Sequence, residues 1–105
     1  WGTYDRATPD ELAEDISSGE VILVDVRGKG EWAEGHIPGA HHYMLGYLLD
    51  TADEIINGKP IVVQCQTGGR AAIGASILQA KGAGHVINMT GGFNAWETAG
   101  KTVEN

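Results

Sequence analysis

The chain has 105 residues, the usual length of one domain, and a domain of this size can bury a hydrophobic core without disulfides. Fourteen acidic residues against seven basic ones give a formal net charge of −7, which argues against nonspecific nucleic-acid binding, because such binding depends on neutralising phosphates. No apolar run reaches membrane-spanning length and no signal-peptide pattern is present, so we expect no membrane partner. A single cysteine cannot form an internal disulfide, which fits a reducing compartment such as the cytoplasm.

Strand and helix patterns alternate along the chain. Runs of β-branched and apolar residues predict strands at residues 21–26, 61–63 and 85–89. Short strands are also expected at residues 4–7, as an edge strand, and at residues 40–42, after a turn. Helical spacing and end signals predict helices at residues 8–19, 31–34, 45–56, 71–81 and 93–98. The first helix has the clearest start, with Thr8 as the N-cap, Pro9 at the first position and Glu11 completing a capping box. This alternation predicts an α/β fold, and we expect residues 1–105 to form one domain.

The stretch from Lys59 to Gly82 contains the only cysteine. Ile61–Val63 is an apolar, β-branched run typical of a strand covered on both faces. Ile73 and Ile77 lie one helical turn apart and predict the apolar side of the helix that follows. Cys65–Arg70 therefore lies where a strand ends and a helix begins.

This position favours chemistry at Cys65. The first turn of a helix presents unpaired backbone N–H groups, which stabilise a thiolate, and the thiolate is the nucleophilic form of cysteine. Gly68 and Gly69 allow successive N–H groups to point inward and form an anion cradle, and Arg70 adds a fixed cation. The alternative is a buried, inert cysteine, but such a cysteine does not require a Gly-Gly-Arg loop beside it.

Asp25 and Arg27 end another predicted strand, at the edge of the sheet where α/β proteins place their ligands. We favour a structural role for Asp25, as a partner of loop N–H groups or of Arg27, because a carboxylate beside a thiolate would oppose its ionisation. His36 is interpreted as a scaffold residue rather than a base. The adjacent His41 and His42 point to opposite faces of a strand and have no companion ligand at metal-site spacing, so we expect no metal and no cofactor.

Four ordered motifs resemble those of the rhodanese (sulfurtransferase) domain family, and the resemblance covers nearly the whole chain. They are Val24–Arg27, Glu31–Trp32 with Gly35–Ala40, the loop Cys65–Arg70, and Gly91–Trp96. The resemblance implies a small doubly wound α/β domain with a central, parallel, five-stranded sheet flanked by helices. It also implies transfer of sulfane sulfur through a persulfide on a cysteine.

Carried over to this sequence, the family pattern implies that Cys65 and Arg70 are catalytic and that Asp25, Arg27 and His36 support the site. The residues expected to bind the sulfur through the loop are Gln66, Thr67, Gly68, Gly69 and Ala71. The expected partners are small sulfur donors, such as thiosulfate or glutathione persulfide, and thiol or cyanide acceptors, with a protein thiol or persulfide as a further candidate. No second cysteine can resolve the persulfide, so the acceptor must come from outside the chain.

Loop length separates two enzyme classes. Four residues lie between Cys65 and Arg70, whereas the similar-looking tyrosine and dual-specificity phosphatases have five. The shorter loop fits a persulfide sulfur better than a phosphate, and no obvious general acid is present for a phosphatase. A phosphatase or arsenate reductase is therefore disfavoured. A noncatalytic rhodanese module that binds or regulates a partner is the other alternative, but such modules commonly lack the cysteine.

Two features of the loop depart from common family patterns. Ala71 stands where many members have serine or threonine, which removes a hydroxyl and leaves a backbone N–H. Gln66 and Thr67 are neutral where thiosulfate-specialised members tend to be basic. Together with the net charge of −7, this favours glutathione persulfide, polysulfide or a protein persulfide over thiosulfate as the donor.

The segment Leu45–Leu48 and the Cys65–Arg70 loop are similar to rhodanese domains fused behind metallo-β-lactamase-like persulfide dioxygenases. The chain begins with Trp1 rather than methionine, which fits a domain from such a fusion.

Overall fold

The computed structural model describes residues 5–56, 58–67 and 69–104. The strands are β1 (Asp5–Ala7), β2 (Ile22–Asp25), β3 (His41–His42), β4 (Ile61–Gln64) and β5 (Val86–Met89). The helices are α1 (Pro9–Ser18), α2 (Lys29–Glu34), α3 (Leu48–Ile55), α4 (Gly69–Ala80) and α5 (Gly92–Thr98), and a 3₁₀ turn, η1 (Leu45–Tyr47), leads into α3. The predicted α/β alternation is confirmed. The predicted start of the first strand, Tyr4, lies outside the described residues.

The five strands form one parallel sheet in the order β1-β5-β4-β2-β3. β4 lies in the middle, where Gln64 aligns with Asp25 of β2 and Val63 aligns with Asn88 of β5. Every residue of β4 is buried, as its apolar run predicts. Because all strands are parallel, their carboxyl ends meet at one edge of the sheet, and the residue after β4 lies at the centre of that edge.

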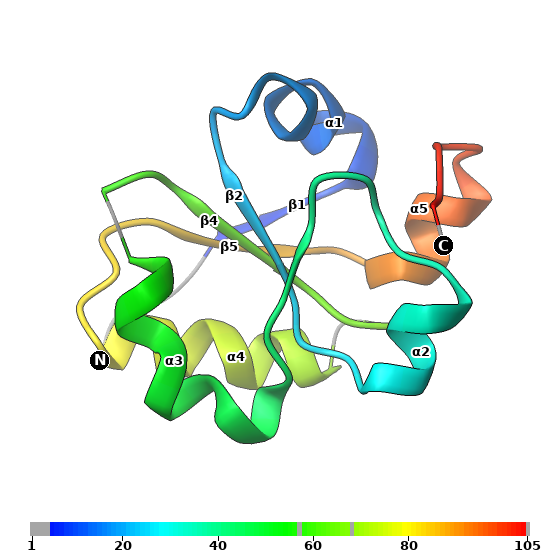
Figure 1. Ribbon diagram of the computed structural model, residues 1–105. Coiled ribbons are helices and arrows are strands. Elements are labelled where there is room, and N and C mark those ends of the chain that lie inside the picture. Colours follow the sequence, from blue (N-terminus) through cyan, green and yellow to red (C-terminus); the bar gives the residue numbers. More distant parts are fainter. Residues whose placement is uncertain (1–4, 57, 68, 105) are drawn as a thin grey trace.

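Helices cover both faces of the sheet (Figure 1). One face packs against α3 and α4, and the core between them includes Val24 and Val63 of the sheet and Leu78 of α4. The other face packs against α1 and α5, and the core between them includes Leu12 of α1 and Trp96 of α5. Alternation of side chains along the strands assigns neighbouring residues to opposite cores.

The first helix begins and ends as its sequence predicts. The Thr8 side chain accepts a hydrogen bond from the Glu11 N–H at 3.3 Å, and the Glu11 carboxylate accepts one from the Thr8 N–H at 2.9 Å. Gly19 ends the helix in the left-handed conformation, with φ of +80°.

The predicted apolar side of α4 is partly wrong. Ile73 is 56% exposed, whereas the residues buried from this helix are Ala71, Gly74, Ala75 and Leu78. The reason is close packing: a Cβ added at Gly74 would lie 3.2 Å from Val63 and 3.4 Å from Leu48. The helix therefore turns its small residues toward the sheet and leaves a larger one in solvent.

Several predicted boundaries also differ from the structure. The helix expected at residues 45–56 is divided into η1 and α3, and the strand expected at 40–42 is shortened to His41–His42. Among the described residues, no helix is both long enough and apolar enough to cross a membrane.

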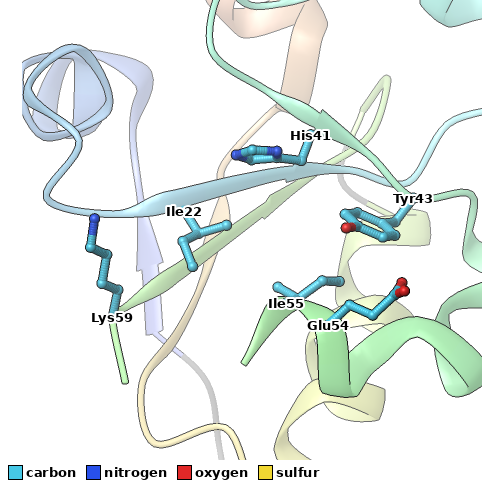
Figure 2. Close-up of a pocket in the computed structure, with 6 residues that line it drawn as sticks. All are labelled: Ile22, His41, Tyr43, Glu54, Ile55 and Lys59. Atoms are coloured by element: carbon cyan, nitrogen blue, oxygen red, sulfur yellow. The ribbon is translucent and has the colours of Figure 1, made fainter. Parts of the chain in front are cut away.

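A hollow of ≈ 250 Å³ lies beside β3. Figure 2 shows the side chains that line it, which are Ile22, His41, Tyr43, Glu54, Ile55 and Lys59. Ile22 begins β2 and Lys59 precedes β4, so this hollow extends to the amino ends of the strands. The cysteine loop lies at the opposite, carboxyl edge of the sheet.

Candidate active site

Cys65 follows β4 directly and α4 begins four residues later, at Gly69, so the predicted strand-loop-helix arrangement is confirmed. The cysteine is buried, with 1% of its surface exposed, and it lies at the centre of the carboxyl edge of the sheet. Thr67 and Gly69 are exposed on the loop, while Gly68 lies outside the described residues.

The Ala71 N–H donates a hydrogen bond to Cys65 Sγ at 3.4 Å. This N–H belongs to the first turn of α4, whose first four N–H groups have no partner within the helix. The Ala71 backbone therefore supplies a donor to the sulfur although its side chain has no hydroxyl. An anionic sulfur at this position would lie against the positive end of a twelve-residue helix.

Helix α5 holds the other side of the loop backbone. The Cys65 carbonyl accepts a hydrogen bond from the Phe93 N–H at 2.7 Å, and the Gln66 carbonyl accepts one from the Asn94 N–H at 3.0 Å. The approach is close because Gly92 has no side chain and a φ of +57°, and an added Cβ would lie 2.2 Å from the Cys65 carbonyl oxygen. These carbonyls are thus occupied by α5.

Arg27 is a buried cation beside the loop, with 1% of its surface exposed. Its Nε lies 3.0 Å from both Asp25 carboxylate oxygens, and its Nη2 lies 2.8 Å from Oδ2. It also donates to the Gly35 carbonyl at 2.7 Å and to Gln66 Oε1 at 3.1 Å, and it lies 4.2 Å from the Phe93 ring centre. Burial of this charge is compensated by a fully buried carboxylate and by further acceptors.

The Gln66 side chain is held at both ends. Its oxygen accepts from Arg27, and its nitrogen donates to the Asn94 side chain. We expected Gln66 to bind sulfur, and this geometry leaves its backbone, rather than its amide, as the group available for that role.

Arg70 forms a two-point ion pair with Glu31 of α2. Its Nη1 and Nη2 each donate to one Glu31 carboxylate oxygen at 2.7 Å. The hydrogen bonds from Arg70 lower the Glu31 pKa from 4.5 to about 2, and the Glu31 carboxylate in turn raises the pKa of Arg70. Glu31 also accepts the Gly28 N–H at 3.1 Å, so one carboxylate begins α2 and holds the loop cation.

His36 lies on Trp32 of α2, with the two ring centres 3.7 Å apart. Its Nδ1 lies 3.0 Å from the Trp32 carbonyl, which fits a scaffold role, while its Nε2 faces Glu104 rather than backbone, at 3.6 Å. His42 stacks on the same Trp32 ring, and its Nε2 lies 2.7 Å from the Arg27 carbonyl. Within the described part of the chain, no three His, Cys, Asp or Glu residues gather as metal ligands would.

Sequence reasoning did not assign roles to Glu31, Gly92 or Asn94, although all three lie in motifs shared with the family. The glycine pair at the start of α5, Gly91 and Gly92, was an available signal, because paired glycines at a helix start indicate unusual backbone angles or a close approach. The Glu31–Arg70 pair spans 39 positions, and local spacing cannot predict such a contact.

The family model for the rhodanese-like domain matches residues 8–99. The uncharacterized protein YqhL of Bacillus subtilis is 36% identical over 74 residues, which cover 70% of this chain and 59% of that protein, so the match spans less than two thirds of that relative. A sulfurtransferase of Allochromatium vinosum is 33% identical over 81 residues, covering 77% of this chain and 76% of that protein. The thiosulfate sulfurtransferase GlpE of Pseudomonas syringae is 32% identical over 93 residues, covering 89% and 88%.

Solved structures are similar as well. The crystal structure of a rhodanese-like domain protein from Staphylococcus aureus aligns with a TM-score of 0.79 at 32% identity, covering 88% of this chain and 90% of that one.

Proposed function

Since the chain belongs to the rhodanese-like domain family, we propose that it is a sulfurtransferase that moves sulfane sulfur from a donor to a thiol or cyanide through a persulfide on Cys65. The proposed donors are thiosulfate, glutathione persulfide or a protein persulfide. We place the reaction in the cytoplasm and take residues 1–105 as one domain.

The contact between the Ala71 N–H and Cys65 Sγ carries this proposal. It puts a backbone donor of the first helical turn on the sulfur that would become charged, as an oxyanion hole does for oxygen. The α5 N–H groups occupy the Cys65 and Gln66 carbonyls, so the loop can direct N–H groups rather than carbonyl oxygens toward the sulfur.

The reaction has two halves. The Cys65 thiolate attacks the outer sulfur of the donor, the bond between that sulfur and the rest of the donor breaks, and its electron pair leaves with the remainder; thiosulfate would leave as sulfite. An acceptor then bonds to the outer sulfur of Cys65–S–S⁻, and the S–S electron pair returns to Cys65 as thiolate. In this scheme the loop N–H groups hold the charged sulfur, and Arg70, while paired with Glu31, adds its positive charge at the rim of the loop. Asp25, Arg27 and His36 keep the loop in place.

Steady-state kinetics test the proposal. Formation of thiocyanate from cyanide is measured with thiosulfate or glutathione persulfide as the donor, for the wild type, Cys65→Ser and the surface variant Glu20→Gln. We expect ping-pong kinetics, a loss of about 100-fold or more in Cys65→Ser, and an unchanged rate in Glu20→Gln. A rate in Cys65→Ser equal to that of the wild type would overturn the proposal.

A further inference from the structure

The guanidinium of Arg70, the cation of the loop, is already paired with a carboxylate of the same chain. Arg70 donates to both oxygens of Glu31, and both side chains are only partly exposed, at 40% for Arg70 and 35% for Glu31. A bidentate pair of this kind uses the face of the guanidinium that would otherwise receive a carboxylate or sulfonate. Glu31 remains ionised at neutral pH, so the pair adds no net charge to the site.

The second guanidinium beside the loop is also compensated. Arg27 is paired with the buried carboxylate of Asp25. A hollow of ≈ 170 Å³ lies between α2 and α5, with Gln66 of the loop and Phe93 in its lining. Its lining also includes the carboxylates of Glu31, Glu34 and Glu97. The two cations of this region are thus balanced by Asp25 and Glu31, and the exposed carboxylate of Glu97 adds a further negative charge.

The opposite flank of the loop differs. There Thr67 lines a hollow of ≈ 220 Å³ together with Arg6, which is a cation. The relative rates of different thiols in the wild type therefore reflect both flanks of the loop. The contribution of the α2 flank is measured by how much a Glu31 substitution changes the rate for each thiol.

We propose that Glu31 determines the charge class of the sulfur acceptor: by occupying Arg70 and adding a carboxylate to the hollow beside the loop, it favours thiols that carry an ammonium group over thiols that carry a carboxylate. This inference rests on the proposed sulfurtransferase function. The physical reason is that an ammonium is attracted by the negative hollow, while a carboxylate meets repulsion and finds no available guanidinium.

The step concerned is the second half of the reaction. The sulfur of the acceptor R–SH bonds to the outer sulfur of Cys65–S–S⁻, the bond from that sulfur to Sγ breaks, and its electron pair returns to Cys65 as thiolate. The product is R–S–SH, which retains the proton of the acceptor, so atoms and charge balance. Glu31 takes no part in these bond changes and acts on the approach of R.

Single-turnover transfer tests the inference with three small thiols. Persulfidated protein is mixed with cysteamine, 2-mercaptoethanol or 3-mercaptopropionate, and loss of the sulfur adduct is followed by mass spectrometry. For each thiol the rate of Glu31→Gln is divided by that of the wild type, which cancels the intrinsic reactivity of the thiol. We expect the ratio for 3-mercaptopropionate to exceed that for cysteamine by about threefold or more, with a smaller difference at high salt.

Two further variants complete the design. Glu97→Gln changes an exposed residue of α5 in the same hollow and should shift the ratios in the same direction. If Glu31→Gln is poorly folded, Glu97→Gln still tests whether negative charge in this hollow selects among the thiols. Glu20→Gln removes the same charge at the amino edge of the sheet, just before β2, and should give equal ratios for all three thiols.

The outcomes separate the two proposals. Persulfide that forms normally but is transferred with equal ratios in Glu31→Gln and Glu97→Gln would overturn the role of Glu31 and leave the sulfurtransferase function intact. Equal shifts in Glu20→Gln would also overturn it, because net charge alone would then explain the effect. Absence of any persulfide would overturn the sulfurtransferase function and this inference with it.

Discussion

Gly92 allows the backbone of α5 to approach the loop that begins at Cys65. Its φ of +57° is unfavourable for other residues, and the position of an added Cβ, 2.2 Å from the Cys65 carbonyl oxygen, leaves no space for a side chain. The hydrogen bond from Phe93 to the same carbonyl depends on this approach. Gly92 therefore contributes both to stability and to the shape of the loop.

Substitution of Gly92 by alanine should destabilise the protein more than the same change at Gly19. Gly19 also has a positive φ, of +80°, but nothing lies within 4 Å of its added Cβ. We expect Gly19→Ala to cost about 1 kcal/mol and Gly92→Ala about 2 kcal/mol more, because only the second adds a backbone clash. Urea denaturation of both variants measures the difference. Equal free energies of unfolding would contradict this account of Gly92.

Among the site residues, those predictable from sequence are those whose signal is local. Cys65 and Arg70 stand out because a cysteine, two glycines and an arginine lie between a strand pattern and a helix pattern. Glu31 and Asn94 received no role because their contacts join segments 39 and 28 residues apart. Distant contacts of this kind depend on the order of the strands, which no single segment encodes.

Between elements, the Glu31–Arg70 pair connects α2 to the start of α4. Glu31 also accepts the Gly28 N–H at the start of α2, so the carboxylate joins two helix starts. This pair should make stability depend on pH in the acid range. The Glu31 pKa is lowered from 4.5 to about 2 in the folded protein, mainly by the hydrogen bonds from Arg70.

A lowered folded-state pKa means that the unfolded chain binds more protons in this range, so stability falls with falling pH. The contribution of Glu31 is fully present above 4.5 and is lost as the pH falls toward about 2. We therefore expect Glu31→Gln to lose less stability than the wild type between about pH 6 and about pH 3, as measured by urea midpoints. Glu20→Gln should follow the wild type. Parallel losses in Glu31→Gln and the wild type would show that the pair does not contribute.

The helix α4 illustrates why element type is easier to predict than orientation. Its existence follows from a run of helix-compatible residues and a glycine stop. Its orientation does not, because Ile73 is exposed while Gly74 faces Val63 of the sheet. A glycine on the packed face allows the helix to approach closely, and that gain depends on the partner strand rather than on the helix sequence.

For the whole molecule, alternating patterns predicted the α/β class, and the family resemblance implied the parallel five-stranded sheet that the structure contains. Composition alone could not provide the strand order β1-β5-β4-β2-β3, which depends on packing across the domain. That order matters for function because it puts the strand before Cys65 in the middle of the sheet. The loop is thereby supported by α4 on one side and α5 on the other.

Mass spectrometry of the intact protein after brief exposure to thiosulfate, and separately to glutathione persulfide, tests the proposed chemistry at its covalent step. We expect a gain of one sulfur atom, about 32 Da, that cyanide removes and that is absent from Cys65→Ser. The larger yield should come from glutathione persulfide, because thiosulfate is a compact dianion and the neutral Gln66 and Thr67 give the loop no cation to receive it in a chain of net charge −7. No adduct from either donor, with Cys65 still open to alkylation, would contradict the sulfurtransferase function and favour a partner-binding module.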